Sequence, residues 1–542
     1  MGTVTLTQIE ATGIQEYIFG SNNLRQNVGA SELVTRATSG WVAEILKELE
    51  PQAQVEWDAG DCTLKFLSGG VRAEVIYAGG GNALILFDGK PDGLAKDFTR
   101  RFTRLVLEMA RGLSLVVGHA EFDWDGDALS DQHRKLREKM QQRKLDHAPD
   151  APLPGLGVTA ACVFTGLPAV EEIEGRLISQ AVRHKLDKYP EADDRHHSVL
   201  PRVREKQYEF VYDFEQFGEK GESSYIAVIH TDGNRMGERF RVIGDAHPKP
   251  EQNAAYAKQL RVLSRAVNVQ ATKALRAVVD LLIASYVPQK KCFGKVVPVP
   301  MKGNRLPFHP IVFGGDDVTF VCDGHHGLAL AAKYLQVLAA EKLPGAREGE
   351  WGDPLYARAG VAVVKSHYPF SRAYDLAEEL AKSAKDKLGE RTRDGKGAVM
   401  DWHFSTSGVV LPLKQIRARE YVSAEGNCLL MRPVGLRLDA TIKDTEWRTW
   451  ENFASVMAKF QDQDGKWFGR RNKVKALRDA LRQGPKAVEQ FLANYQIPAL
   501  PDIPGQSRMP TTGWQGHEDC GYFDAIEALD FYDPLDGKEG KK

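Results

Sequence analysis

The stretch IVFGGDDVTF, residues 311–320, sets two glycines and two aspartates between runs of apolar, β-favouring residues. Such runs around a glycine pair are typical of a β-hairpin, because glycine readily adopts the positive φ angles of a tight turn. We therefore expect a two-residue turn at Gly314-Gly315 that carries Asp316 and Asp317 at the hairpin tip.

A second acidic turn comes earlier in the chain, in YIAVIHTDGNRMG, residues 225–237. Its apolar strand, 225–231, ends in Asp232, and the glycines that follow let the backbone turn sharply and approach a ligand closely. Phosphates can then lie against backbone N–H groups at the start of the next helix. In a β-α-β-β unit the first strand lies beside the hairpin, so we expect Asp232 and Asp316 to meet.

Three carboxylates with no histidine or thiol partner favour Mg²⁺ or Mn²⁺ over zinc. Adjacent carboxylates repel each other, and an apolar setting raises one pKa unless a cation intervenes. A centre with two ions about 3.5–4 Å apart would suit phosphoryl or nucleotidyl transfer. The alternative is that each segment is only a surface turn, but their joint occurrence on successive strands favours the metal centre.

The order β-α-β-β-α-β occurs twice. The sequence predicts the first copy as strands at 3–10, 71–78, 83–87 and 113–122, with helices at 21–49 and 92–110. It predicts the second copy as strands at 225–231, 310–313, 318–322 and 357–364, with helices at 253–285, 326–341 and 371–388. The repetition indicates an internal duplication, with chance similarity of two α+β segments as the alternative.

Four regions follow from this pattern: a first unit at 1–125, a connector at 126–221, a second unit at 222–405 and a mostly helical region at 406–542. In the connector we expect a charged helix at 131–146 and a loop at 189–197. In the last region, the aromatic stripe at 446–460 has helical spacing typical of a core, and residues 537–542 are expected to be disordered.

The composition is that of a globular protein: 542 residues, 42% hydrophobic and 27% charged. With 72 basic and 73 acidic residues, the chain as a whole is no polyelectrolyte partner for nucleic acid. The first residues lack a secretion signal, and no apolar run approaches the roughly 20 residues of a membrane helix. The six cysteines are too far apart for a zinc knuckle or a disulfide framework, so we expect a cytoplasmic protein.

The motifs DGNRMG (232–237) and GGDD (314–317) resemble the second palm domain of the large polymerase/cyclase subunit of type III CRISPR effectors. They more distantly resemble GGDEF diguanylate cyclases. The segments GIQEYIF (13–19) and GASEL (29–33) look like the opening of the first palm domain of that family. The segment GVAVV (360–364) is similar to the family's closing strand, so the likeness spans about residues 3–400.

The resemblance implies an α+β protein with two ferredoxin-like palm domains and a helical C-terminal domain. It further implies two ATP molecules at the interface between the palms, joined into cyclic oligoadenylate when a 3′-hydroxyl attacks an α-phosphate. Asp232 and Asp316 would bind the metal, and Asp317 would bind metal or position the hydroxyl. The residues expected to contact the nucleotide beside them are Gly233, Asn234, Gly237, Gly314, Gly315 and the phosphate-binding Lys385.

Other parts of the resemblance leave alternatives open. Lys385 is equally well explained as part of a solvated helix face. In the first palm, Gly80, Gly81 and Asn82 would hold the acceptor nucleotide or simply turn the chain. Many family members have an aspartate where this chain has Asn234, which removes one possible metal ligand.

Two family features are not expected here. The sequence has no His-Asp dipeptide, so we expect no nuclease activity. Cys162 sits where the family often has a zinc-binding insert, but its partner cysteines are missing.

The alternative function is a non-catalytic subunit that senses nucleotide or acts as a scaffold in an RNA-guided complex. The basic and aromatic stretch 466–475 suits RNA contact, although a solvated helix face explains it better. Effector subunits are candidate partners, no membrane is expected, and a homo-oligomer is left open.

Overall fold

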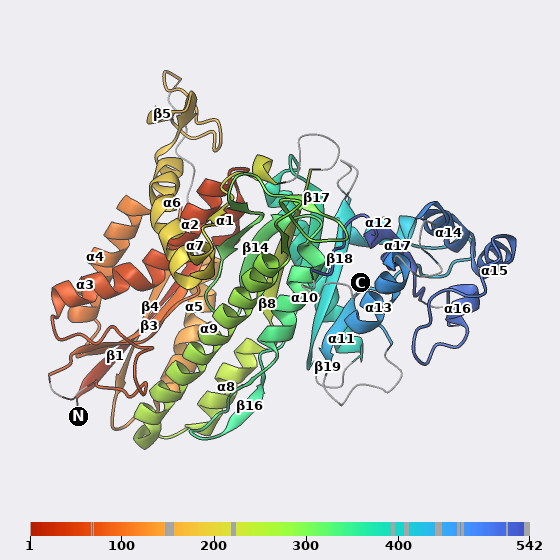
Figure 1. Cartoon of the computed structure of the whole chain (residues 1–542). Helices are drawn as coiled ribbons and strands as arrows, with labels where there is room; N and C mark the ends of the chain where they lie inside the picture. Colours follow the sequence, from red (N-terminus) through yellow and green to blue (C-terminus); the bar gives the residue numbers. More distant parts are fainter. Residues whose placement is uncertain are drawn as a thin grey trace.

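The computed structural model describes residues 2–66, 68, 70–146, 157–217, 224–391, 396–405, 411–438, 447–462, 467, 471–515 and 519–535. Figure 1 shows two mixed sheet-and-helix units side by side, with the helices that follow β19 packed at one end. This arrangement confirms the predicted α+β class.

The first unit is a four-stranded antiparallel sheet in the order β2-β3-β1-β4. Its strands alternate with helices as the sequence predicts, and Gly80 and Gly81 join β2 to β3 with positive φ angles of 60° and 84°. The elements are β1 (Thr3–Thr12), α1 (Ile14–Phe19), α2 (Leu24–Thr35), α3 (Trp41–Leu49), β2 (Ala73–Gly79), β3 (Asn82–Asp88), α4 (Leu94–Met109) and β4 (Ser114–Asp123).

The second unit repeats this strand order as β13-β14-β8-β17 and extends it with β18 and β19. Its elements are β8 (Tyr225–Gly233), α8 (Met236–Ala246), α9 (Asn253–Ala284), β13 (Phe308–Val312), β14 (Val318–Asp323), α10 (Gly327–Leu338), β17 (Ala357–Lys365), α11 (Phe370–Arg391), β18 (Gly397–Ser405) and β19 (Val434–Leu438). β18 runs parallel to β17, and β19 pairs with β18 from beyond residue 405, where we had placed the end of this unit.

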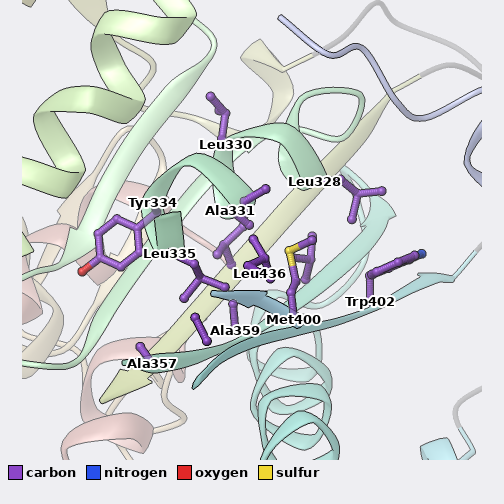
Figure 2. Packing of buried hydrophobic residues seen from close by; sticks show 14 of the residues in the cluster. Leu328, Leu330, Ala331, Tyr334, Leu335, Ala357, Ala359, Met400, Trp402 and Leu436 are labelled. Carbon is purple, nitrogen blue, oxygen red and sulfur yellow. The ribbon is translucent and has the colours of Figure 1, made fainter. Parts of the chain in front are cut away.

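Helices cover both faces of the second sheet. The apolar helix α10 packs on one face, and Figure 2 shows Leu328, Ala331 and Leu335 against side chains of three strands: Ala359, Met400 and Leu436. Helix α11 covers the other face so closely that a Cβ atom at Gly360 of β17 would lie 1.9 Å from the Ala377 carbonyl oxygen.

A buried ion pair joins the two units. The Arg261 guanidinium on α9 contacts Glu74 on β2 at 2.8 Å, and both side chains are fully buried. Arg261 also donates to the carbonyl oxygens of Ile76 and Thr63, each at 3.1 Å. Because a buried charge requires its partners, this contact fixes the first hairpin relative to α9.

The connector contains a longer helix than we expected. The charged helix is present as α5 (Leu129–Asp146), but residues 189–197, predicted as a loop, lie within α6 (Gln180–Val199) despite Pro190. The reason is tertiary packing: a Cβ atom at Gly29 of α2 would lie 1.7 Å from the Lys185 carbonyl oxygen, so the helices touch backbone to backbone. Beside α6, the short hairpin of β5 (Glu171–Ile173) and β6 (Arg176–Ile178) projects from the body in Figure 1.

The C-terminal region is mostly helical, as predicted. The aromatic stripe forms the buried face of α13 (Trp450–Gln461), where Phe453, Val456 and Met457 are core residues. Residues 537–542 lie outside the described residues. Among the helices that the structure describes, none has the length and apolar character needed to cross a membrane.

Candidate metal and nucleotide site

Three carboxylates meet at the end of β8. Strand pairing sets Val318 opposite Thr231, so the loop before β14 lies beside the last residues of β8. One carboxylate oxygen each from Asp232, Asp316 and Asp317 lies within 4.8 Å of the other two. Two chain segments that are far apart in sequence therefore form one acidic group, with the geometry that the motifs predict.

The loop that carries Asp316 and Asp317 is longer than expected. β13 ends at Val312 and β14 begins at Val318, so five residues connect the strands, in contrast to the predicted two-residue turn. Strand β13 also contains a register shift between Pro310 and Val312. Gly314 and Gly315 do adopt positive φ angles, of 128° and 94°.

Asn268 on α9 anchors this loop. Its side-chain oxygen accepts a hydrogen bond from the Gly315 backbone N–H at 2.6 Å. We did not predict this residue from the sequence, because nothing in the helical pattern of 253–285 distinguishes it from its polar neighbours.

The charged forms of the two hairpin carboxylates, Asp316 and Asp317, are disfavoured in the metal-free protein. Desolvation raises the pKa of Asp316 above its usual value. It also raises the pKa of Asp317 to about 7, and the negative charges of Asp316 and Glu378 add to this increase. Asp317 is exposed, so solvent screens part of this effect. Bound positive charge favours the charged forms, so the donor set fits a hard divalent cation such as Mg²⁺ or Mn²⁺.

One guanidinium group contacts the acidic cluster. Arg358 on β17 lies opposite Asp232 in the strand register and forms an ion pair with the Asp232 carboxylate. Its other terminal nitrogen donates to the Asn234 side-chain oxygen at 3.1 Å. Asn234 is buried, and its amide nitrogen donates to the Gly397 carbonyl oxygen at 3.0 Å. Asn234 is thus engaged inside the protein, and Arg358 is a site residue that the motifs did not indicate.

A cavity of about 370 Å³ lies between the two units. The first hairpin contributes Gly80, Gly81 and Asn82, and the acidic loop contributes Gly315 and Asp316. The two tips nearly touch, since a Cβ atom at Gly80 would lie 3.6 Å from the Gly314 carbonyl oxygen. The structure therefore brings together the candidate residues of both units.

Other elements complete the cavity wall. Helix α5 adds the basic residues Arg137 and Lys144, and Lys144 forms an ion pair with Glu10. Aromatic residues line the wall at Trp57, Tyr77 and Phe240. The α5 residues could not be predicted from the motifs, because this helix belongs to the connector and lies far from either motif in the sequence.

Three further candidates, Gly233, Gly237 and Lys385, do not line the cavity. Gly233 packs directly against Asp316, and Gly237 is exposed in the first turn of α8. Lys385 is exposed on α11, one turn after Ala381, whose backbone packs on Gly360. Phosphate binding by Gly237 and Lys385 therefore stays a prediction.

A β-α-β-β-α-β unit with acidic residues at its first strand end and its hairpin tip is a palm domain. Residues 225–394 match the family model described as Cas10/Cmr2, second palm domain. This match confirms the resemblance of the second unit to the palm domain of the polymerase/cyclase subunit of type III CRISPR effectors. No curated protein sequence matches the chain.

Solved structures match over nearly the whole chain. A Csm1-Csm4 cassette in complex with cA4 is 15% identical, with a TM-score of 0.53 over 97% of this chain and 69% of the matched chain. A Csm1-Csm4 cassette in complex with one ATP gives the same identity and TM-score over 97% and 70%. A cassette in complex with AMPPNP has a TM-score of 0.52. At this identity the likeness establishes the fold.

Proposed function

We propose that this protein is a magnesium-dependent nucleotidyltransferase that joins ATP into a cyclic oligonucleotide. The observation that carries this proposal is the convergence of Asp232, Asp316 and Asp317 within 4.8 Å beside a cavity between two hairpin tips. A scaffold gains nothing from two crowded carboxylates with raised pKa values, whereas phosphoryl transfer requires such a centre.

The cavity has the chemistry of a nucleotide site. Its basic residues, Arg137 and Lys144, suit phosphate oxygens, and its aromatic side chains suit the face of a base. Csm1-Csm4 cassettes of similar fold are in complex with one ATP, AMPPNP or cA4, which supports adenine nucleotides as the ligand class.

The residues have distinct roles in this proposal. When bound at the three aspartates, Mg²⁺ or Mn²⁺ supplies positive charge to the oxygens of the transferred phosphate. Asp317 would bind the metal with the other two aspartates or position the attacking 3′-hydroxyl. The new bond joins that oxygen to the α-phosphate, and pyrophosphate leaves.

Other residues hold the nucleotides. Gly314 and the first turn of α8, including Gly237, offer backbone N–H groups, and Lys385 contributes positive charge. The N–H of Gly315 is held by Asn268, so Gly315 acts by letting the backbone turn beside the nucleotide. Gly80, Gly81 and Asn82 face the acidic tip across the cavity and are placed to hold the acceptor nucleotide.

We further propose that the protein works as a subunit of a type III CRISPR effector in antiviral defence. The family match and the likeness to Csm1-Csm4 cassettes support this assignment. Of the basic and aromatic stretch considered for RNA contact, Trp467 is buried and packs on Phe460, while positions 466 and 468–470 lie outside the described residues. RNA contact by base stacking on Trp467 is therefore not proposed.

The test is turnover of each of four α-labelled nucleoside triphosphates with Mg²⁺, with and without added RNA. Wild-type protein should convert ATP, and Asp316→Ala/Asp317→Ala should abolish the product. Asp92→Ala/Asp97→Ala, which removes two exposed carboxylates of the first unit, is the matched control and should retain activity. ATP binding without product under every condition would favour the nucleotide-sensing or scaffold subunit.

A further inference from the structure

We propose that the Arg358 guanidinium is the counter-ion of Asp232 in the metal-free protein and competes with the divalent cation for this carboxylate. Asn234 controls how strongly Arg358 binds Asp232. This inference rests on the proposed function, because it concerns access of the cation to the same three carboxylates. It assigns Arg358 and Asn234 as positioning residues.

The backbone places Arg358 on Asp232. Residues 358 and 232 are direct partners in the antiparallel register of β17 and β8. The guanidinium contacts the Asp232 carboxylate, and the two side chains are only 12% and 29% exposed. An ion pair with this little solvent is screened weakly, so it is stronger than an ordinary surface pair.

The guanidinium and a divalent cation compete for the same carboxylate. The oxygen of Asp232 that contacts Arg358 cannot direct the same lone pair at a metal ion. Two positive charges a few ångströms apart also repel each other. Binding of the cation through that oxygen is therefore favoured when the guanidinium moves away from Asp232.

The phosphate oxygens of an incoming triphosphate can replace Asp232 as the partner of the guanidinium. Arginine binds phosphate oxygens through two parallel hydrogen bonds, and its planar group can exchange one anion for another. A nucleotide beside Asp232 would draw Arg358 away and open Asp232 to the cation. The pair thus couples metal binding to nucleotide binding and disfavours a metal ion held without substrate.

Asn234 has a definite place in this arrangement. Its oxygen accepts from Arg358 and its nitrogen donates to Gly397, so it holds the guanidinium from the side opposite Asp232. A neutral amide holds a guanidinium less strongly than a carboxylate does. An aspartate at this position would share Arg358 and weaken its grip on Asp232. The asparagine therefore leaves Asp232 as the main counter-ion.

The experiment measures Mn²⁺ binding to the full chain by electron paramagnetic resonance, which needs no turnover. Arg358→Gln should lower the Kd for Mn²⁺ at least about threefold without nucleotide, because it removes the competing charge. Arg241→Gln, which removes an exposed arginine of α8 paired with Asp245, is the matched control and should leave the Kd unchanged. Adding AMPPNP should tighten Mn²⁺ binding more in the wild type than in Arg358→Gln.

A second variant covers the case in which Arg358→Gln does not fold. Arg358→Met removes the charge but keeps an unbranched side chain, and it should also tighten Mn²⁺ binding. An unchanged or weaker affinity in a folded Arg358→Gln protein, or in Arg358→Met when the first variant is unfolded, would overturn the inference.

The outcomes separate this inference from the proposed function. If Mn²⁺ binding disappears in Asp316→Ala/Asp317→Ala but is not tightened in Arg358→Gln, the metal site stands and only the counter-ion role of Arg358 is refuted. Mn²⁺ binding that is absent from the wild type and from Arg358→Gln, or that persists in the double aspartate variant, refutes the metal site itself.

Discussion

The backbone of Gly233 lies directly against the side chain of Asp316. A Cβ atom at residue 233 would stand 2.6 Å from the Asp316 Cβ and 3.0 Å from its Oδ2. The strand end that carries Asp232 and the hairpin that carries Asp316 are thus in van der Waals contact, and a hydrogen at position 233 is what allows the carboxylates to converge.

Gly233→Ala should therefore separate the two acidic segments. The added methyl group must push the loop or the strand away, which we expect to cost about 1–3 kcal/mol in the free energy of unfolding. Mn²⁺ affinity should fall about tenfold, measured by the same resonance titration. Gly237→Ala is the control, because its Cβ would meet nothing within 4 Å and alanine is the better helix former. Wild-type Mn²⁺ binding in Gly233→Ala would show that the contact is unimportant.

Asp317→Asn should stabilise the metal-free protein at high pH. The folded-state pKa of Asp317, about 7, lies above its ordinary value of 3.8, so ionisation disfavours the folded state. This penalty is absent below pH 3.8, grows between pH 3.8 and about 7, and is constant above that. With Asp317 partly exposed, we expect a gain of roughly 1 kcal/mol at pH 8.

The measurement is thermal unfolding of wild type and variant in EDTA across this pH range. A stability difference that does not grow with pH would contradict the raised pKa. The same titration makes a second prediction for the wild type: Mn²⁺ affinity should weaken as the pH falls below about 7, because a proton then competes for Asp317.

Asn268→Ala should loosen the acidic loop without changing any carboxylate. It removes the acceptor of the Gly315 N–H bond, a contribution of about 1 kcal/mol. We expect Mn²⁺ affinity to fall about threefold to tenfold, since the carboxylates are less well ordered before binding. Ser264→Ala, one turn earlier on α9 and lining the same cavity, should have a smaller effect. If the two variants lower Mn²⁺ affinity equally, Asn268 does not anchor the loop.

The Arg195 side chain on the connector helix α6 lies beside the acidic hairpin, and we expect its loss to destabilise the protein. Its guanidinium pairs with the nearly buried Glu32 at 2.6 Å and lies 4.5 Å from the ring of Phe313, the residue before Gly314. Arg195→Met should destabilise the protein by about 1–3 kcal/mol, because it leaves the Glu32 charge uncompensated.

Double-variant analysis tests the origin of that loss. Arg195→Met combined with Glu32→Gln should recover much of the stability in chemical unfolding, because no buried charge then remains. Arg204→Met, which breaks the exposed pair with Asp194, should have little effect. A double variant less stable than Arg195→Met would refute this explanation.

The sequence predicted the two palm units because their signals are local. Alternating apolar residues mark β1, a continuous apolar run marks β8, and neighbouring glycines mark both hairpins. Convergence of Asp232 with Asp316 followed from the strand order of the unit alone. These inferences need only neighbouring residues and a known topology.

The missed features depend on contacts between distant residues. Arg358 reaches the site because it lies opposite Asp232 in the strand register. Asn268 reaches it because its side chain binds the loop between β13 and β14. Pro190 and the polar residues around it predicted a loop, but close packing on Gly29 keeps α6 helical through this segment. None of these partners is visible in the local pattern of residue types.

The pairing of β19 with β18 has a consequence for how the protein is made. Until residues 434–438 leave the ribosome, the outer edge of β18 carries unpaired backbone groups that can join other chains. A fragment cut at residue 405 would keep every proposed site residue and still expose this edge, so it should aggregate during expression. A fragment that continues through residue 438 supplies the missing strand and is the better choice for isolating the second palm.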